Sequence, residues 1–201
     1  MIAVIDYEVG NLFSVQNGLK RAGVESVVTR NPKVLDDAKG ILLPGVGAVR
    51  DAMAHLEKFD LIPVIERNVQ KGKPFVGICL GMQLLFDKSY EDGEYDCLSL
   101  LKGEVVPFKT DLKVPHMGWN RVKSKQKSPV MEGLEAEYFY FIHSYLLDPK
   151  YDENIIAYAE YDGMVPAVVG KENILGMQFH PEKSGRAGVQ ILKNIDKFIG
   201  E

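Results

Sequence analysis

The sequence predicts an α/β protein built on an open, doubly wound and mainly parallel sheet, with helices covering both faces. In the first half of the chain, short apolar runs alternate with amphipathic stretches, an order typical of a parallel sheet with helical crossovers. The second half carries several short strand-like runs whose connections are too short for crossover helices, so some strands there must be antiparallel. Polar and glycine-rich segments follow the early strands, where the sites of such folds gather.

The first half of the chain supplies the parallel part of this sheet. Its opening run, Met1–Asp6, predicts a first strand. Asn11 is a candidate N-cap for the helix that follows, Gly23 ends that helix, and Asn31-Pro32 ends the next strand. The expected strands are 1–6, 24–29, 40–43 and 75–79, and the expected helices are 12–22, 48–56, 61–71 and one that begins directly after residue 79.

The second half is expected to contain more strands than helices. The expected strands are 104–108, 119–122, 138–142, 155–161, 166–169 and 174–179. A closing helix over 185–199 carries Val189, Leu192, Ile195 and Ile199 on one face. Because no repeat, low-complexity segment or linker interrupts the sequence, we expect a single domain over residues 1–201.

Composition narrows the class of protein. With 201 residues, of which 46% are hydrophobic, the chain is long enough for one well-buried core. Its net charge of -4 argues against a general nucleic-acid or anionic-membrane binder. Two cysteines, Cys79 and Cys97, do not make a disulfide framework, and the first residues lack the basic region of a signal peptide. No apolar run approaches the roughly 20 residues that span a bilayer, so we expect a cytoplasmic protein.

Cys79 lies at the most distinctive corner of the sequence, where a buried strand turns directly into a helix. Gly77 and Gly81 flank it symmetrically, which gives the pattern Gly-x-Cys-x-Gly of a nucleophile elbow. Such a corner presents the sulfur over a helix N-terminus, where the helix dipole favours a thiolate. A lone cysteine is more often an inert core residue, but the two glycines favour the catalytic interpretation.

His180 and Glu182 supply the other groups that a cysteine nucleophile needs. His180 directly follows an apolar run, and Pro181 takes the chain out of the sheet so that Glu182 can lie against the imidazole. A histidine that merely ends a strand is the bland alternative; beside the elbow, a Cys79–His180–Glu182 triad is favoured. His55 lies on an amphipathic stretch and is interpreted as a surface or boundary residue.

Three segments of the chain resemble the signatures of class I, or triad, glutamine amidotransferases: Pro44–Gly47, Gly77–Gln83 and His180–Glu182. The resemblance spans essentially the whole chain and implies a flavodoxin-like, doubly wound fold. It also implies that Cys79 attacks the side-chain amide of glutamine, that a thioester forms as ammonia leaves, and that water then releases glutamate. It implies no cofactor, and no Cys/His cluster has metal-ligand spacing, so we expect no metal.

Within this family, three further segments resemble the amidotransferase subunits of imidazole glycerol phosphate synthases of histidine biosynthesis: Pro115–Asn120, Tyr140–Tyr145 and His180–Ser184. The resemblance implies a heterodimer that passes ammonia to a separate cyclase subunit, whose ligand switches the glutaminase on. The implied roles are glutamine binding by Gly45, Gln83, Glu91, Ser144 and Tyr145, oxyanion N–H groups from Val46, Gly47 and Leu80, and docking of the cyclase near Trp119, Asn120, Tyr140 and Lys183.

Other interpretations remain open from the sequence. The chain could serve another synthase, such as that of anthranilate or of pyridoxal phosphate, or be a catalytically silent regulatory module on the same fold. A different cysteine hydrolase with a nucleophile elbow is a third possibility. The sequence departs from the family at Glu8, where members usually carry glycine, and this leaves the shape of the loop Asp6–Asn11 open.

Overall fold

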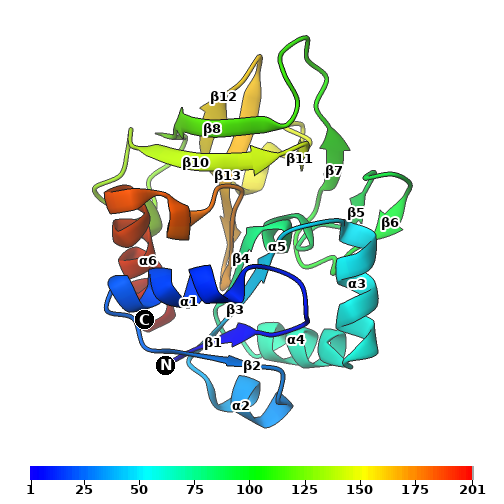
Figure 1. Cartoon of the computed structure of the whole chain (residues 1–201), viewed down its shortest axis with the longest axis vertical. Helices are drawn as coiled ribbons and strands as arrows, with labels where there is room; N and C mark the ends of the chain where they lie inside the picture. Colours follow the sequence, from blue (N-terminus) through cyan, green and yellow to red (C-terminus); the bar gives the residue numbers. More distant parts are fainter. Residues whose placement is uncertain (201) are drawn as a thin grey trace.

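The computed structural model describes residues 1–200, and its central element is an eight-stranded sheet with helices on both faces (Figure 1). The strand order is β2–β1–β3–β4–β14–β13–β12–β9. Neighbours from β2 to β14 pair in parallel, whereas those from β14 to β9 pair antiparallel. The predicted change from parallel to antiparallel pairing is therefore confirmed.

The bounds of the strands are β1 (Ile2–Ile5), β2 (Ser26–Thr29), β3 (Gly40–Gly45), β4 (Phe75–Cys79), β5 (Lys88–Ser89), β6 (Tyr95–Asp96), β7 (Glu104–Pro107), β8 (His116–Arg121), β9 (Lys123–Ser124), β10 (Tyr138–His143), β11 (Tyr145–Leu147), β12 (Ile155–Glu160), β13 (Met164–Lys171) and β14 (Ile174–Met177). The helices are α1 (Leu12–Arg21), α2 (Pro32–Asp37), α3 (Val49–Lys58), α4 (Leu61–Gln70), α5 (Leu80–Gln83) and α6 (Gly185–Gly200), with short 3-10 turns η1 (Pro129–Met131), η2 (Asp152–Asn154) and η3 (Pro181–Lys183).

Two hydrophobic cores lie on opposite faces of the large sheet. Along β1, Ile2 and Val4 join the core that α1 and α6 cover, whereas Ala3 and Ile5 join the core under α2, α3 and α4. Successive strand residues point to opposite faces, so the continuous apolar run of β1 serves both cores. Helices on both faces are the doubly wound arrangement that the sequence predicts.

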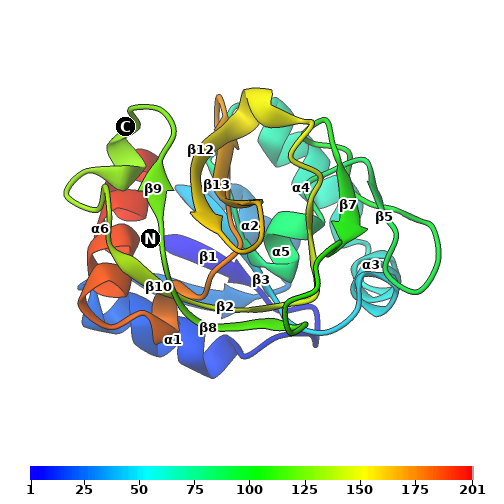
Figure 2. The same ribbon diagram turned by 90° about the horizontal axis from the view of Figure 1, so that it is seen from above.

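Two smaller sheets complete the structure. One is the antiparallel pair β8–β10, and the other has the order β11–β7–β5–β6. The β8–β10 pair lies above α1 and α6 in Figure 1 and along the same edge of the molecule as α1 in Figure 2. No helix within residues 1–200 has the length and apolar character needed to cross a membrane.

The structure corrects several sequence-based boundaries. Asn31-Pro32 follows the end of β2 at Thr29, as expected, but it also starts the helix α2, which was not predicted: Asn31 caps the backbone N–H of Lys33 and proline suits the first helical position. The helix after Cys79 ends at Gln83, and Leu84–Phe86 are buried in a turn. Strand β3 continues through Pro44 to Gly45, where a loop was expected, and β8 begins at His116 rather than at residue 119. The strands β5, β6, β9 and β11 were not predicted, because two or three residues carry no periodic pattern.

Candidate active site

The corner at Cys79 has the strained geometry that the flanking glycines predict. β4 ends at Cys79 and α5 begins at Leu80, and Cys79 has φ 55° and ψ -108°. A positive φ is costly for a residue with a side chain and occurs mostly where the surroundings enforce it. A Cβ at Gly77 would overlap the carbonyl group of Gly81, and a Cβ at Gly81 would overlap that of Leu43. The two glycines therefore let the chain fold back on itself at this corner.

His180 and Glu182 form a buried pair beside the elbow. His180 Nδ1 lies 2.8 Å from Glu182 Oε1, and both side chains are 3% exposed. Glu182 lies in the turn η3. Arg21 of α1 fixes this turn by donating a hydrogen bond to the backbone carbonyl of Glu182 at 2.8 Å. The predicted contact between the glutamate and the imidazole is therefore confirmed.

The environment of His180 keeps it protonated near neutral pH. Burial lowers its pKa, but the neighbouring Cys79 and Glu182 side chains outweigh burial and raise the pKa of His180 from 6.5 to about 9. Its Nε2 atom is buried and has no hydrogen-bond partner among the described residues. An imidazolium beside the sulfur favours a thiolate and is ready to protonate a leaving amine.

A cavity of about 270 Å³ opens at the elbow. It is smaller than the roughly 300–1,000 Å³ of sites that hold drug-sized ligands, which suits a single amino acid. Segments from four parts of the chain meet in it, and the lining includes the predicted residues Val46, Gly47, Cys79, Leu80, Gln83, Glu91, Ser144, Tyr145, His180 and Lys183.

Two of the predicted glutamine-binding residues have structural contacts of their own. Glu91 accepts a hydrogen bond from the backbone N–H of Val49 at 2.7 Å, so its Oε2 caps the start of α3. Gly45 is not part of the cavity lining found within residues 1–200. It pairs with Cys79 across β3 and β4, and a Cβ there would lie 2.6 Å from the buried Tyr7 hydroxyl. Glycine is therefore required at position 45 for packing.

The predicted oxyanion segment is the most open part of the cavity wall. Val46 is 41% exposed. Gly47 has φ 102°, and a Cβ at this position would meet nothing within 4 Å. The glycine is explained by its backbone angle, and the space around it leaves room for the peptide to turn.

Gln178 is a site residue that the sequence analysis missed. It is fully buried, and its Nε2 lies 3.9 Å from Cys79 Sγ. Its Oε1 accepts from Gln83 Nε2 at 3.1 Å, and the same Gln83 nitrogen donates to the carbonyl of Tyr145 at 2.9 Å. The available signal was a polar residue inside the apolar run that leads to His180.

A pair of contacting histidines, His143 and His116, lies at the wall of the cavity, which His143 helps to line. His143 Nδ1 is 2.8 Å from the carbonyl of Tyr145, and His143 Nε2 is 3.0 Å from His116 Nδ1. Burial lowers the pKa of His116 to about 4. Burial, together with the positive charges that His116 and His180 can carry, lowers the pKa of His143 to about 3. Both rings are neutral at physiological pH.

The outward side of the β8–β10 pair exposes an apolar surface beside the cavity. Register places Trp119 opposite Tyr140, with ring centroids 6.3 Å apart, and the ammonium group of Lys183 lies 5.9 Å from the Tyr140 ring centroid. The side chains of this outer face are the apolar or aromatic Met117, Trp119, Tyr138, Tyr140 and Ile142, with Arg121 opposite Tyr138 at one end. Asn120 differs from its neighbours, because its amide donates to the carbonyl of Glu160 at 3.0 Å and contacts His116.

The outer face is joined directly to the catalytic segment. The backbone N–H of His180 donates to the carbonyl of Tyr140 at 2.9 Å, and Ser184 Oγ accepts from the backbone N–H of Tyr140 at 3.0 Å. A displacement of β10 would therefore act on His180 without any intervening residue.

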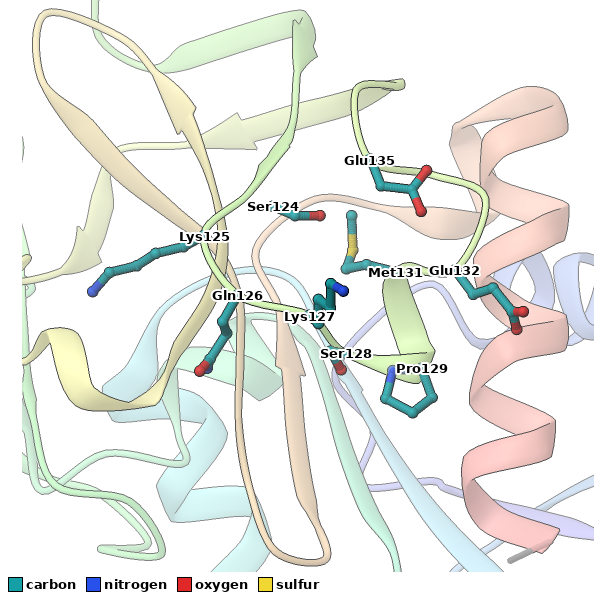
Figure 3. A pocket seen from close by; sticks show the side chains of 9 residues that line it. All are labelled: Ser124, Lys125, Gln126, Lys127, Ser128, Pro129, Met131, Glu132 and Glu135. Atoms are coloured by element: carbon teal, nitrogen blue, oxygen red, sulfur yellow. The ribbon is translucent and has the colours of Figure 1, made fainter.

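A larger cavity elsewhere contains none of the predicted site residues. It measures about 690 Å³ and lies between the segment that follows β9 and the turn η1 (Figure 3). Its charged side chains, Lys125, Lys127, Glu132 and Glu135, are of both signs. Lys125 is bound to Asp152 at 2.6 Å. Within residues 1–200, no group of three or more His, Cys, Asp or Glu side chains could hold a metal ion.

A thiol on a nucleophile elbow, a buried His–Glu pair and a small adjoining cavity define a cysteine-dependent acyl-transfer site on a doubly wound fold. The family model for glutamine amidotransferase class-I matches residues 3–197. The chain belongs to the class I glutamine amidotransferase family.

Curated relatives narrow the similarity to one kind of subunit. The chain is 49% identical to the imidazole glycerol phosphate synthase subunit HisH of Bacillus velezensis, an alignment covering 100% of this chain and 98% of that one. It is 46% identical to the subunit of the same name from Bacillus subtilis, again covering 100% of this chain and 98% of the relative.

Solved structures agree on the fold. A structure described as a glutamine amidotransferase matches with a TM-score of 0.79 at 19% identity, covering 100% of both chains. The PurLQS structure from Thermotoga maritima matches with a TM-score of 0.76 at 21% identity, covering 96% of both chains.

Proposed function

We propose that this chain is the glutaminase subunit of imidazole glycerol phosphate synthase, a cytoplasmic enzyme that releases ammonia from glutamine for a separate cyclase subunit in histidine biosynthesis. The observation that carries this proposal is the meeting of the Cys79 elbow with the buried His180–Glu182 pair in one small cavity. Similarity over the full chain to subunits of that synthase supports the choice of pathway.

The proposed chemistry assigns one role to each side chain of the triad. Cys79 attacks the side-chain amide carbon of glutamine, and the protonated His180 gives its proton to the departing ammonia. A water molecule, activated by the now neutral imidazole, then cleaves the thioester and releases glutamate. Glu182 holds the ring through Nδ1, at 2.8 Å, and stabilises its positive charge.

The remaining cavity residues are assigned to substrate and to the oxyanion. Gln83, Glu91, Ser144 and Tyr145 hold the glutamine, and Gly45 shapes the adjoining backbone. The oxyanion receives the backbone N–H of Leu80 and an N–H from Val46 or Gly47. Loss of one such donor typically slows acyl transfer by about 10²- to 10³-fold, so rotation of the open Val46–Gly47 peptide is sufficient as an activity switch.

The outer face of the β8–β10 pair is the proposed docking surface for the cyclase. Soluble proteins rarely leave large aromatic side chains grouped in this way without a partner, and Trp119 is 56% exposed. Lys183 lies at the edge of this face and also lines the cavity. Asn120, whose amide is bound to Glu160, contributes its backbone in β8 to the shape of that surface.

Glutaminase activity of the isolated chain, of the chain with cyclase, and of the complex with the nucleotide substrate of the cyclase tests the proposal. We expect weak hydrolysis alone and strong hydrolysis in the full complex, because ammonia released without an acceptor is wasted. Full activity of the isolated chain would point to a free-standing glutaminase, and no activity with any partner would point to a silent module.

A further inference from the structure

Gln178 is a buried amide that lies against the nucleophile and has no role in the triad. Its side chain is inaccessible to solvent, and its Nε2 approaches Cys79 Sγ to 3.9 Å. A buried amide that lacks partners is destabilising, so both ends of this side chain should be hydrogen bonded. The identity of the end that faces the sulfur then decides which form of the sulfur is favoured.

One backbone carbonyl, that of Tyr145, fixes that orientation through Gln83. A carbonyl only accepts, so Gln83 must present its NH₂ group to Tyr145, at 2.9 Å. The same NH₂ group faces Gln178 at 3.1 Å, so the group of Gln178 on that side must be its oxygen. The NH₂ group of Gln178 is thereby directed at Cys79.

The hydrogen bonds of His143 and His116 are consistent with this orientation of Gln83 and Gln178. His143 must donate from Nδ1 to the carbonyl of Tyr145, so its neutral ring accepts at Nε2 from His116 Nδ1. His116 then accepts at Nε2 from the amide of Asn120, whose NH₂ group is directed by the carbonyl of Glu160. The carbonyl of Tyr145 therefore receives two donors, and every group from Asn120 to Gln178 has a defined direction.

We propose that Gln178 is a positioning residue whose side-chain NH₂ group donates a hydrogen bond to the sulfur of Cys79 and so favours the thiolate. The helix that follows the elbow is only four residues long, from Leu80 to Gln83, so its dipole is weaker than the sequence analysis expected. A side-chain donor compensates for that short helix.

The inference rests on the proposed function for its role in catalysis, but its test does not need glutamine. The rate of Cys79 alkylation by iodoacetamide is measured over a pH series on the full chain, with mass spectrometry separating the Cys79 peptide from that of Cys97. We expect Gln178→Glu and Gln178→Met to move the midpoint of the profile upward by about one pH unit, because each loses one donor to a charged acceptor. Gln126→Glu, which removes an amide donor to the carbonyl of Ile155, is the matched control and should leave the midpoint unchanged.

A second measurement needs no substitution. In the ¹⁵N-labelled wild-type chain, the side-chain NH₂ resonances of Gln178 should titrate with the same midpoint as Cys79 alkylation. The proposal would be overturned if the Gln178 variants fold and keep the wild-type alkylation profile. It would also be overturned if the Gln178 resonances do not shift across the pH range in which Cys79 titrates. In either case the glutaminase assay of the wild-type complex is unaffected, so the proposed function and the role of Gln178 fail separately.

Discussion

His180 and His143 line the same cavity and are both buried, yet their pKa values move in opposite directions. His180 faces the Glu182 carboxylate and the Cys79 thiol, which raise its pKa to about 9. His143 faces a carbonyl and a second imidazole, and burial dominates, so its pKa falls to about 3. Burial lowers the pKa of both rings, so the difference in charge comes from whether a hydrogen-bond partner, such as Glu182, is strong enough to outweigh it.

The regions around these two histidines should also differ in whether they affect catalytic rate or association with the cyclase. In the proposed function, the region of Cys79, His180 and Glu182 carries the chemistry, whereas the β8–β10 region with His116 and His143 serves packing and docking. Substitutions in the first should change rates without changing association, whereas substitutions of exposed side chains on the outer face of the second should chiefly weaken association.

Removal of the nucleophile should have the largest effect. We expect Cys79→Ala to lower glutamine hydrolysis by at least about 10⁴-fold, while synthesis by the cyclase with added ammonia survives. Glutamate release and ammonia-dependent synthesis are measured on the same complex. Cys97→Ala is the control, since that half-buried thiol lies outside the cavity found within residues 1–200, and it should retain activity. Substantial hydrolysis by Cys79→Ala would exclude the thioester mechanism.

Substitutions of His180 and of Glu182 should lower the glutaminase activity by different amounts. Glu182→Gln keeps the shape of the side chain but loses its charge, so it should leave roughly 10²-fold more glutaminase activity than His180→Ala, as an orienting group does in comparable triads. Values of kcat for both variants in the activated complex decide the order. If Glu182→Gln were the weaker enzyme, Glu182 would have a role beyond orienting the ring.

Docking should depend on the other region. We expect Trp119→Ala to weaken association with the cyclase by about 30-fold, the effect of losing a typical aromatic hot spot. Calorimetric titration of the two subunits measures the Kd, and Lys127→Ala, beside the larger cavity of Figure 3, provides a distant control. An unchanged Kd would place the docking surface elsewhere on the molecule.

The smallest expected effect is on the pH dependence of stability, to which His180 and His143 should contribute in opposite directions. His180 has a raised pKa, so its contribution to stability is fully present below pH 6.5 and is lost as the pH rises through about 9. His143 has a lowered pKa, so stability is lost as the pH falls below 6.5 toward about 3. For His143 this amounts to about 1–2 kcal/mol between pH 7 and pH 5.

Urea unfolding at several pH values checks this prediction. His143→Asn, whose amide can still reach the carbonyl of Tyr145, should flatten only the acid side of the stability profile, and His180→Asn only the alkaline side. Equal changes on both sides for either variant would remove the contrast between the two rings.

The parts of the site that the sequence predicts are those set by neighbouring residues. Gly77 and Gly81 around Cys79 indicate a sharp corner in the chain. Pro181 between His180 and Glu182 directs the carboxylate back to the imidazole. Both geometries are local, so they could be predicted from the sequence. The roles in binding glutamine and the cyclase, and the single-domain organisation over residues 1–201, remain predictions.

The parts that were missed depend on contacts between distant segments. His116 meets His143 only through the register of β8 and β10, and Gln178 meets Cys79 only because β14 lies beside β4. Neither pairing leaves a local pattern.

Glu8 illustrates the same limit. It adopts φ 65°, which explains the glycine usual at that position, but its ion pairs with Arg30 at 3.1 Å and Lys58 at 3.4 Å connect residues far apart in the chain.

The contact between Glu91 and α3 has a consequence for inhibitor design. Oε2 of Glu91 already accepts the backbone N–H of Val49, so in the proposed function Oε1 is the oxygen with both lone pairs available for the ammonium group of a ligand. A compound that competes for both oxygens would uncap α3 two residues after Gly47 and loosen the wall it is meant to fill. Tight inhibitors should therefore carry one compact cation that contacts Oε1. Bulky or doubly charged head groups should bind more slowly, because they must first displace the start of α3.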